Sequence, residues 1–304
     1  MTIRIVDLET TTLEPFEKIN GVVEMGSVDL EEDTGQLIGA RSYLVYPGRK
    51  ISPESRAIHH ISDDMVENSE TLDKVWPKIM SAWPNPPYFA AHNAKFEMQW
   101  LQSLVPFAKW ICTYKCALRI WPDAPNHQNY TIFYMLNIEV PGNAEILPAH
   151  RAGPDAIVTA LILKHMLRVE GVALEQLLEW SSEPAFFRSA PIKFGKYKGK
   201  LWNEPPSDYW EWIRDKSDKD EDVKWNARQE LLARQDVKEV YSDMALRAIA
   251  TAPSVHWLNH WWKVDEAPHR RDYGITKGGL HYNELVAACA KRKKELEVSE
   301  PAGV

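Results

Sequence analysis

The alternation of apolar and polar residues in the first half of the chain predicts both strands and helices. Runs typical of strands cover residues 4–9, 21–30 and 39–45, and shorter apolar runs at 88–93 and 110–113 predict two more. Helical spacing of apolar residues covers 71–83, 95–104 and 155–170. The early strands favour an antiparallel meander, and the mixture that follows predicts an α/β domain ending near residue 180.

The second half of the chain has a different pattern. A segment rich in glycine and lysine covers residues 189–199, and a charged loop is predicted at 215–222. Apolar spacing predicts a long helix at 223–250 and a last helix at 284–297, followed by a frayed tail. We therefore expect a domain at 1–180, a smaller accessory region at 181–250 and an extension of unknown role at 251–304.

The amino-acid composition restricts the class of protein but does not indicate a function. Of the 304 residues, 44% are hydrophobic and 26% are charged, proportions typical of a soluble globular protein. The chain shows neither a run of apolar residues long enough to span a membrane nor a secretory leader, so we expect no membrane partner. The odd and sparse set of cysteines predicts a reducing, cytoplasmic setting. The three cysteines, Cys112, Cys116 and Cys289, lack the spacing of a zinc site and are expected to be buried thiols.

Asp7 and Glu9 are the first candidates for chemistry. Residues two apart on a strand point to the same face, so both carboxylates should emerge together at the end of the first strand. Neighbouring carboxylates repel unless a cation lies between them, and Mg²⁺ or Mn²⁺ suits oxygen ligands. A solvated strand end is the competing interpretation of so short a motif.

Two further motifs supply a third and a fourth carboxylate and a histidine. The run His92-Asn93-Ala94-Lys95-Phe96-Glu97 follows an apolar strand, so Glu97 can approach the strand ends where α/β sites form. His150 lies in a loop and Asp155 in the first turn of the next helix. Asp155 can bind a metal while His150 accepts the proton of an attacking water, or the two can be an ordinary helix-start aspartate and loop histidine.

The order and context of these motifs resemble the DEDDh exonucleases, the family of the proofreading subunit of DNA polymerase III. The chain is more similar to the exodeoxyribonuclease X-like members, through Ser52-Pro53 to Ile61, Trp110-Ile111-Cys112-Thr113 and Phe194-Gly195-Lys196-Tyr197-Lys198-Gly199-Lys200. The resemblance covers about residues 3–235. It implies a ribonuclease H-like mixed sheet flanked by helices, a small C-terminal module, and 3′→5′ hydrolysis with two divalent metal ions.

The resemblance also implies roles for individual residues. Asp7, Glu9 and Asp155 would bind metal with Glu97 beside them, and His150 would be the general base. The terminal nucleotide would lie in a pocket for which the candidates are Thr10, Leu13, Met25, His59, Asn93 and Phe96. For Leu13, Met25 and His59, a role in the core or in a loop is the alternative. Lys196, Tyr197, Lys198 and Lys200 are candidates for contacts to nucleic acid, because lysines can neutralise phosphates and a tyrosine can stack on a base. The alternative is a solvated hairpin whose Phe194 and Tyr197 pack inward.

One residue departs from the family pattern. Glu97 stands where the family has aspartate, and its side chain is one methylene longer. The main hypothesis is a metal-dependent 3′→5′ exonuclease that releases nucleoside 5′-monophosphates from DNA 3′ ends, in a repair setting. The alternatives are a catalytically weakened protein that binds nucleic-acid ends and a 3′→5′ exoribonuclease. Repair or replication proteins are possible partners of the C-terminal region.

Overall fold

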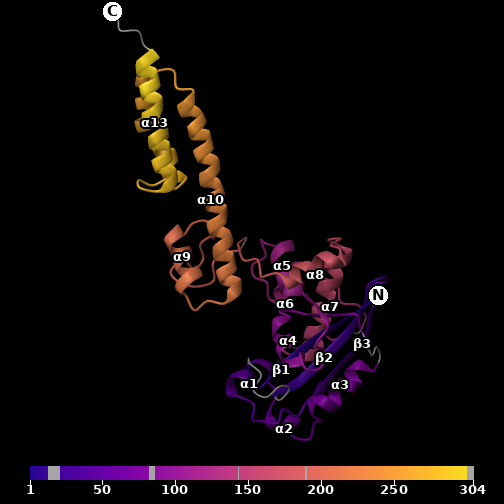
Figure 1. Cartoon of the computed structure of the whole chain (residues 1–304). Coiled ribbons are helices and arrows are strands. Elements are labelled where there is room, and N and C mark those ends of the chain that lie inside the picture. Colours follow the sequence, from indigo (N-terminus) through magenta and orange to yellow (C-terminus); the bar gives the residue numbers. More distant parts are fainter. Residues whose placement is uncertain (13–20, 82–85, 143, 189, 300–304) are drawn as a thin grey trace, which may run out of the picture. The chain divides into compact units, whose positions relative to one another are not determined.

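Figure 1 shows the computed structural model, which describes residues 1–12, 21–81, 86–142, 144–188 and 190–299. The chain divides into two compact units, Met1–Trp202 and Asn203–Val304. Among the helices of the described residues, none combines the length and the apolar character that crossing a membrane requires.

The first unit is built on one mixed sheet of five strands. The strands are β1 (Thr2–Thr10), β2 (Val22–Glu31), β3 (Leu37–Leu44), β4 (Tyr88–Ala91) and β5 (Lys109–Cys112). Their order in the sheet is β3-β2-β1-β4-β5, with β1, β2 and β3 antiparallel and with β4 and β5 parallel to β1. The predicted antiparallel start and the predicted mixed α/β sheet are therefore confirmed.

Helices cover both faces of this sheet. The helices of the first unit are α1 (Pro53–His59), α2 (Asp63–Val66), α3 (Leu72–Met80), α4 (Lys95–Leu101), α5 (Thr113–Ile120), α6 (Asn129–Met135), α7 (Ala152–Arg168) and α8 (Leu174–Ser182). Helix α7 packs across β1, β2 and β3, and its residues share a core with Ile3 and Ile5 of β1. Residues Val6 and Leu8 point to the opposite face and pack with α3 and α4.

The second unit is entirely helical in its described part. Its elements are α9 (Ser207–Lys216), α10 (Glu221–Ala250), α11 (Val255–His260), the π-helical turn η1 (Trp261–Asp265), α12 (Glu266–Asp272) and α13 (Leu280–Ser299). Helices α10 and α13 lie side by side, and their buried residues form a core with Leu258 of α11 (Figure 1). The long helix predicted at 223–250 is confirmed.

Several predicted boundaries were wrong. The apolar run at 110–113 ends as a strand at Cys112, because Thr113 already begins α5. The charged loop is shorter than expected, since α9 extends to Lys216 and α10 begins at Glu221. The last helix begins at Leu280, before the expected start at 284, and reaches Ser299; residues 300–304 of the expected tail lie outside the described residues. All three cysteines are free and buried, as predicted.

Candidate active site

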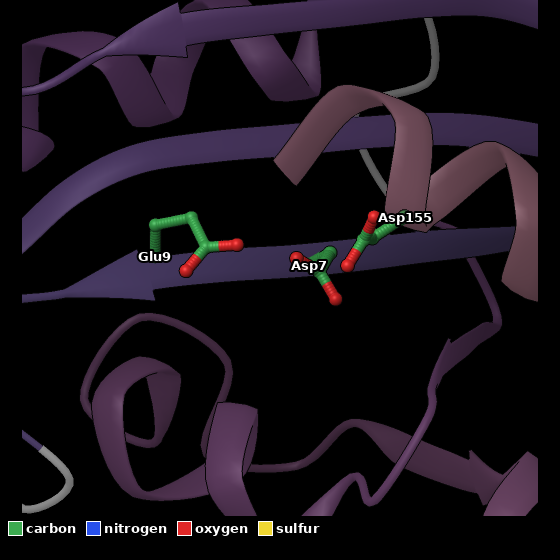
Figure 2. A group of neighbouring side chains, drawn as sticks. All are labelled: Asp7, Glu9 and Asp155. Carbon is green, nitrogen blue, oxygen red and sulfur yellow. The ribbon is translucent and has the colours of Figure 1, made fainter. Parts of the chain in front are cut away.

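Asp7 and Glu9 share the face of β1 that α7 covers. The alternation of a strand puts Ile3, Ile5 and these two carboxylates on one side, and the apolar residues hold that side in the core. Asp155 approaches from the first turn of α7, and one ligand atom from each of the three residues lies within 4.8 Å of the others. Figure 2 shows the three side chains gathered at one place, two from the strand and one from the helix.

A glycine on the neighbouring strand allows this close approach. Gly26 of β2 pairs with Asp7, and a Cβ atom at Gly26 would lie 2.0 Å from the carbonyl oxygen of Ala152. No side chain larger than hydrogen fits in that space. The first residue of α7 can therefore lie directly on β2, which places Asp155 beside Asp7.

Glu97 brings a fourth carboxylate to the site from the first turn of α4. Its side chain is only 3% exposed, and among the described residues its Oε2 atom has no hydrogen-bond partner. Burial, and next the negative charge of Glu9, raise the pKa of Glu97 to about 8. A buried carboxylate oxygen with no donor is the kind of group that a cation satisfies.

The pKa values of Asp7 and Glu9 are raised as well. Burial, with the charges of Asp155 and Glu24, raises the pKa of Glu9 to about 8. Burial and the neighbouring carboxylates also raise the pKa of Asp7 well above its usual range. These groups resist ionisation because each is desolvated beside like charges. An all-oxygen set of this kind fits a divalent cation such as Mg²⁺ or Mn²⁺, whose charge would remove the repulsion.

Helix α6 braces the Asp155 carboxylate. The hydroxyl of Tyr130 lies 2.8 Å from Asp155 Oδ1 and 2.6 Å from the carbonyl oxygen of Ile146. The side-chain amide of Asn129 donates to the backbone carbonyl of Asp155 at 3.2 Å and to Thr159 Oγ1 at 3.0 Å. These contacts tie the first turn of α7 to α6.

His150 lies in the loop that leads into α7, and its side chain is exposed. Its backbone has a φ of 60°, a left-handed conformation that is uncommon for a residue other than glycine. The positive charge that His150 can carry and its backbone amide both favour the ionised form of Asp155. The imidazole therefore stands at the rim of the acidic cluster.

A cleft of about 270 Å³ joins most of the predicted site residues. The predicted residues that line it are Asp7, Glu9, Thr10, His59, Asn93, Phe96, Glu97, His150 and Asp155. His59 Nδ1 accepts a hydrogen bond from the amide of Ile61 at 3.0 Å, whereas its Nε2 is buried and has no partner in the described part of the chain. The cleft thus combines a carboxylate cluster, a histidine base candidate and polar and aromatic walls.

Sequence reasoning missed other residues that line the cleft. They are Leu8, Thr12, Ser55, Ile58 and His92. His92 Nδ1 lies 3.0 Å from Thr113 Oγ1 and its Nε2 lies 2.8 Å from the carbonyl oxygen of His127, so its ring is held at the back of the cleft. Its position in the motif that contains Glu97 was the available signal, and Ser55 and Ile58 lie in the segment Ser52–Ile61 that carries part of the family resemblance.

Two groups of predicted residues lie away from the cleft, and one predicted residue is outside the described part of the chain. Met25 is fully buried in the core beneath β1 and does not line the cleft. Leu13 lies outside the described residues. Lys196, Tyr197, Lys198 and Lys200 belong to a turn at 192–200 and are not among the residues that line the cleft. The turn is closed by two backbone hydrogen bonds of 2.8 Å, from the Ile192 amide to the Lys200 carbonyl and from the Gly199 amide to the Ile192 carbonyl.

Comparisons with known proteins identify the family. The exonuclease family model matches residues 5–163. The chain is 34% identical over 201 residues to exodeoxyribonuclease 10 of Escherichia coli (strain K12). The match covers 65% of this chain and 82% of that protein. It is 28% identical over 168 residues to the DNA polymerase III subunit epsilon of Treponema pallidum (strain Nichols). That match covers 53% of this chain and 74% of that protein.

A solved structure agrees with these matches. Exonuclease X in complex with 5′ overhanging duplex DNA superposes with a TM-score of 0.50 at 31% identity, covering 59% of this chain and 99% of that one. The expected ribonuclease H-like exonuclease fold is therefore confirmed, with additional helices after it. The chain belongs to the DEDDh family of 3′–5′ exonucleases, hydrolases that use divalent metal ions.

Proposed function

We propose that this exonuclease removes nucleotides one at a time from the 3′ ends of DNA and releases nucleoside 5′-monophosphates. The observation that carries the proposal is the cluster of Asp7, Glu9 and Asp155, with the buried and unpartnered Oε2 of Glu97 beside it and His150 at the rim of the same cleft. DNA is the proposed substrate because the similar exonuclease X was solved with duplex DNA.

The four carboxylates are the proposed metal ligands. Asp7 and Glu9 offer oxygens from a rigid strand, Asp155 from a braced helix turn, and Glu97 from the start of α4. Two bound Mg²⁺ or Mn²⁺ ions would supply electrophilic stabilisation of the charge that develops on the phosphate. The protein contributes a fixed donor set that needs no rearrangement before the reaction.

His150 is the proposed general base. Its exposed ring can accept a proton from a water molecule as that water attacks the terminal phosphate. The bond between phosphorus and the 3′ oxygen of the preceding nucleotide then breaks, and the leaving oxygen takes a proton from solvent. A histidine suits this step because an imidazole can both accept and release a proton near neutral pH.

The cleft walls are proposed to select a strand end. Thr10, His59, Asn93 and Phe96 line the cleft beside the carboxylates, and Leu13 is proposed to complete this pocket. The turn that carries Lys196, Tyr197, Lys198 and Lys200 is proposed to contact the strand farther from its end, by phosphate neutralisation and base stacking.

A labelled-oligonucleotide assay tests this function. Single-stranded DNA labelled at its 5′ end is incubated with the wild type, Asp7→Ala and a control, Asp73→Ala, whose exposed aspartate lies on α3. We expect a ladder that shortens from the 3′ end with Mg²⁺ or Mn²⁺, disappears with chelator and is lost only in Asp7→Ala. Faster cleavage of a matched RNA than of the DNA would overturn the DNA assignment in favour of an exoribonuclease.

Glu97 supports a second candidate, a protein that binds nucleic-acid ends without cutting them. The residue departs from the family's aspartate, and a small displacement of a ligand can remove activity. Glu97→Asp in the same assay separates the two. End-binding is the better description if the wild type binds 3′ ends with no ladder and the Glu97→Asp variant cuts.

A further inference from the structure

Glu24 is a buried carboxylate next to the active site that belongs to no proposed ligand set. It lies on β2 directly opposite Glu9 and is 3% exposed. Arg151 binds it with two contacts, Nε to Oε2 at 2.8 Å and Nη2 to Oε1 at 2.7 Å. The amide of Ala152 donates to Oε2 at 3.1 Å and the hydroxyl of Ser42 to Oε1 at 2.9 Å, so both oxygens are saturated.

These contacts hold the backbone that carries His150. Arg151 and Ala152 are the next two residues along the chain, and both bind Glu24, whose strand β2 is paired on both sides. On the other side of His150, the carbonyl oxygen of Ile146 lies 2.6 Å from the hydroxyl of Tyr130. The left-handed backbone of His150 lies between these two attachment points, which restrict the positions that its exposed ring can reach.

The same pair balances charge beside a proposed ligand. The charge of Glu24 raises the pKa of Glu9 and the charge of Arg151 lowers it. The guanidinium therefore compensates a carboxylate that would otherwise repel the cluster. Removing Arg151 would leave Glu24 buried without its cation, which is more costly than removing both residues.

We propose that Glu24 and Arg151 are a positioning pair that sets the reach of His150 over the acidic cluster. The proposal rests on the proposed role of His150 as the base. Neither residue lines the cleft, and Glu24 has all its contacts within the protein. The competing role for Arg151, whose side chain is 30% exposed, is direct contact with a phosphate of the substrate.

The two roles make opposite predictions for Glu24→Gln. If the pair positions His150, losing the charged contact lets the segment shift and lowers kcat, by about 100-fold for a displacement near 1 Å, while KM is unchanged. If Arg151 instead binds phosphate, freeing it from Glu24 should lower KM and leave kcat intact. Arg151→Ala should lower kcat in the first case and raise KM, with a weaker salt dependence of binding, in the second.

A matched control comes from the other end of the same two strands. Arg4 and Asp29 form a buried two-point ion pair between β1 and β2, with both contacts at 2.8 Å, away from the cleft. Asp29→Asn removes a comparable buried charge contact, so it should lower the free energy of unfolding without changing kcat. If Asp29→Asn lowers kcat as much as Glu24→Gln does, the effect is a loss of stability and the positioning role is wrong.

A double-mutant cycle separates this proposal from the proposed function. Steady-state rates are measured on the full chain for wild type, Arg151→Ala, His150→Ala and the double variant, with Arg151→Lys as a partial rescue. We expect Arg151→Ala to cause no further loss once His150 is absent. If His150→Ala keeps wild-type activity, the base assignment fails. If His150→Ala is inactive while Arg151→Ala and Glu24→Gln keep full kcat, the positioning pair alone fails.

Discussion

Replacing Glu97 by glutamine should stabilise the metal-free protein, and increasingly so as the pH rises. The pKa of Glu97 is raised to about 8, mainly by burial, whereas an unfolded glutamate has a pKa of about 4.3. Between these values the native state binds a proton that the unfolded state has released, so the stability of the wild type falls as the pH rises. The free energy of unfolding falls by about 1.36 kcal/mol per pH unit over this range, so the ionisation of Glu97 lowers it by roughly 4 kcal/mol at pH 7. Glutamine has no such cost.

The measurement is the free energy of unfolding in chelator from about pH 4 to 8. Hydrogen exchange of amides in β1 and β2 during urea unfolding reports on the first unit without a signal from the second. Glu175→Gln, which changes an exposed glutamate on α8, is the control and should track the wild type. The reasoning is refuted if the difference between Glu97→Gln and wild type does not change with pH, whatever its size at one pH. Adding Mg²⁺ should shrink the difference, because bound metal stabilises the wild type more.

Three further changes test the architecture of the site. Leu163→Ala, which opens a cavity at a fully buried position of α7, should lower the free energy of unfolding by about 2–5 kcal/mol in urea denaturation; a loss under about 1 kcal/mol would contradict the packing. Gly26→Ala should abolish the exonuclease ladder, because the new methyl group would meet the carbonyl of Ala152 at 2.0 Å and displace α7; wild-type activity would disprove that close contact. Tyr130→Phe removes the hydroxyl 2.8 Å from Asp155 and should weaken Mg²⁺ binding by about 10-fold or more in calorimetry, and unchanged affinity would show that the contact is dispensable.

The sequence predicted those parts of the site that depend on local geometry. Asp7 and Glu9 emerge together because a strand has a period of two, and that period is visible in six residues. Asp155 could be placed near the start of a helix because apolar spacing predicted a helix at 155–170, and the structure has one at Ala152–Arg168. The motif order and the family resemblance then brought the three together, although no periodicity could do so.

Contacts between distant positions were beyond this reasoning. Glu24 and Arg151 are 127 positions apart, and each alone resembles an ordinary charged residue of a strand or a loop. Tyr130 lies in a short helix that the apolar spacing did not predict, so its contact with Asp155 had no signal. Met25 is a different case. Its strand was predicted correctly, but the residue was named as a candidate for the pocket, whereas its side chain lies in the core.

Glu97 shows how the two kinds of information combine. The sequence identified it as a departure from the family and raised the question of its reach. The structure adds that its carboxylate is buried beside Glu9 with Oε2 unpartnered in the described part of the chain, so its pKa matters as much as its reach. Aspartate is one methylene shorter and would hold the carboxylate nearer the backbone of α4. Glu97→Asp therefore changes geometry at constant charge, Glu97→Gln changes charge at nearly constant geometry, and only the first should restore turnover if reach is what limits this site.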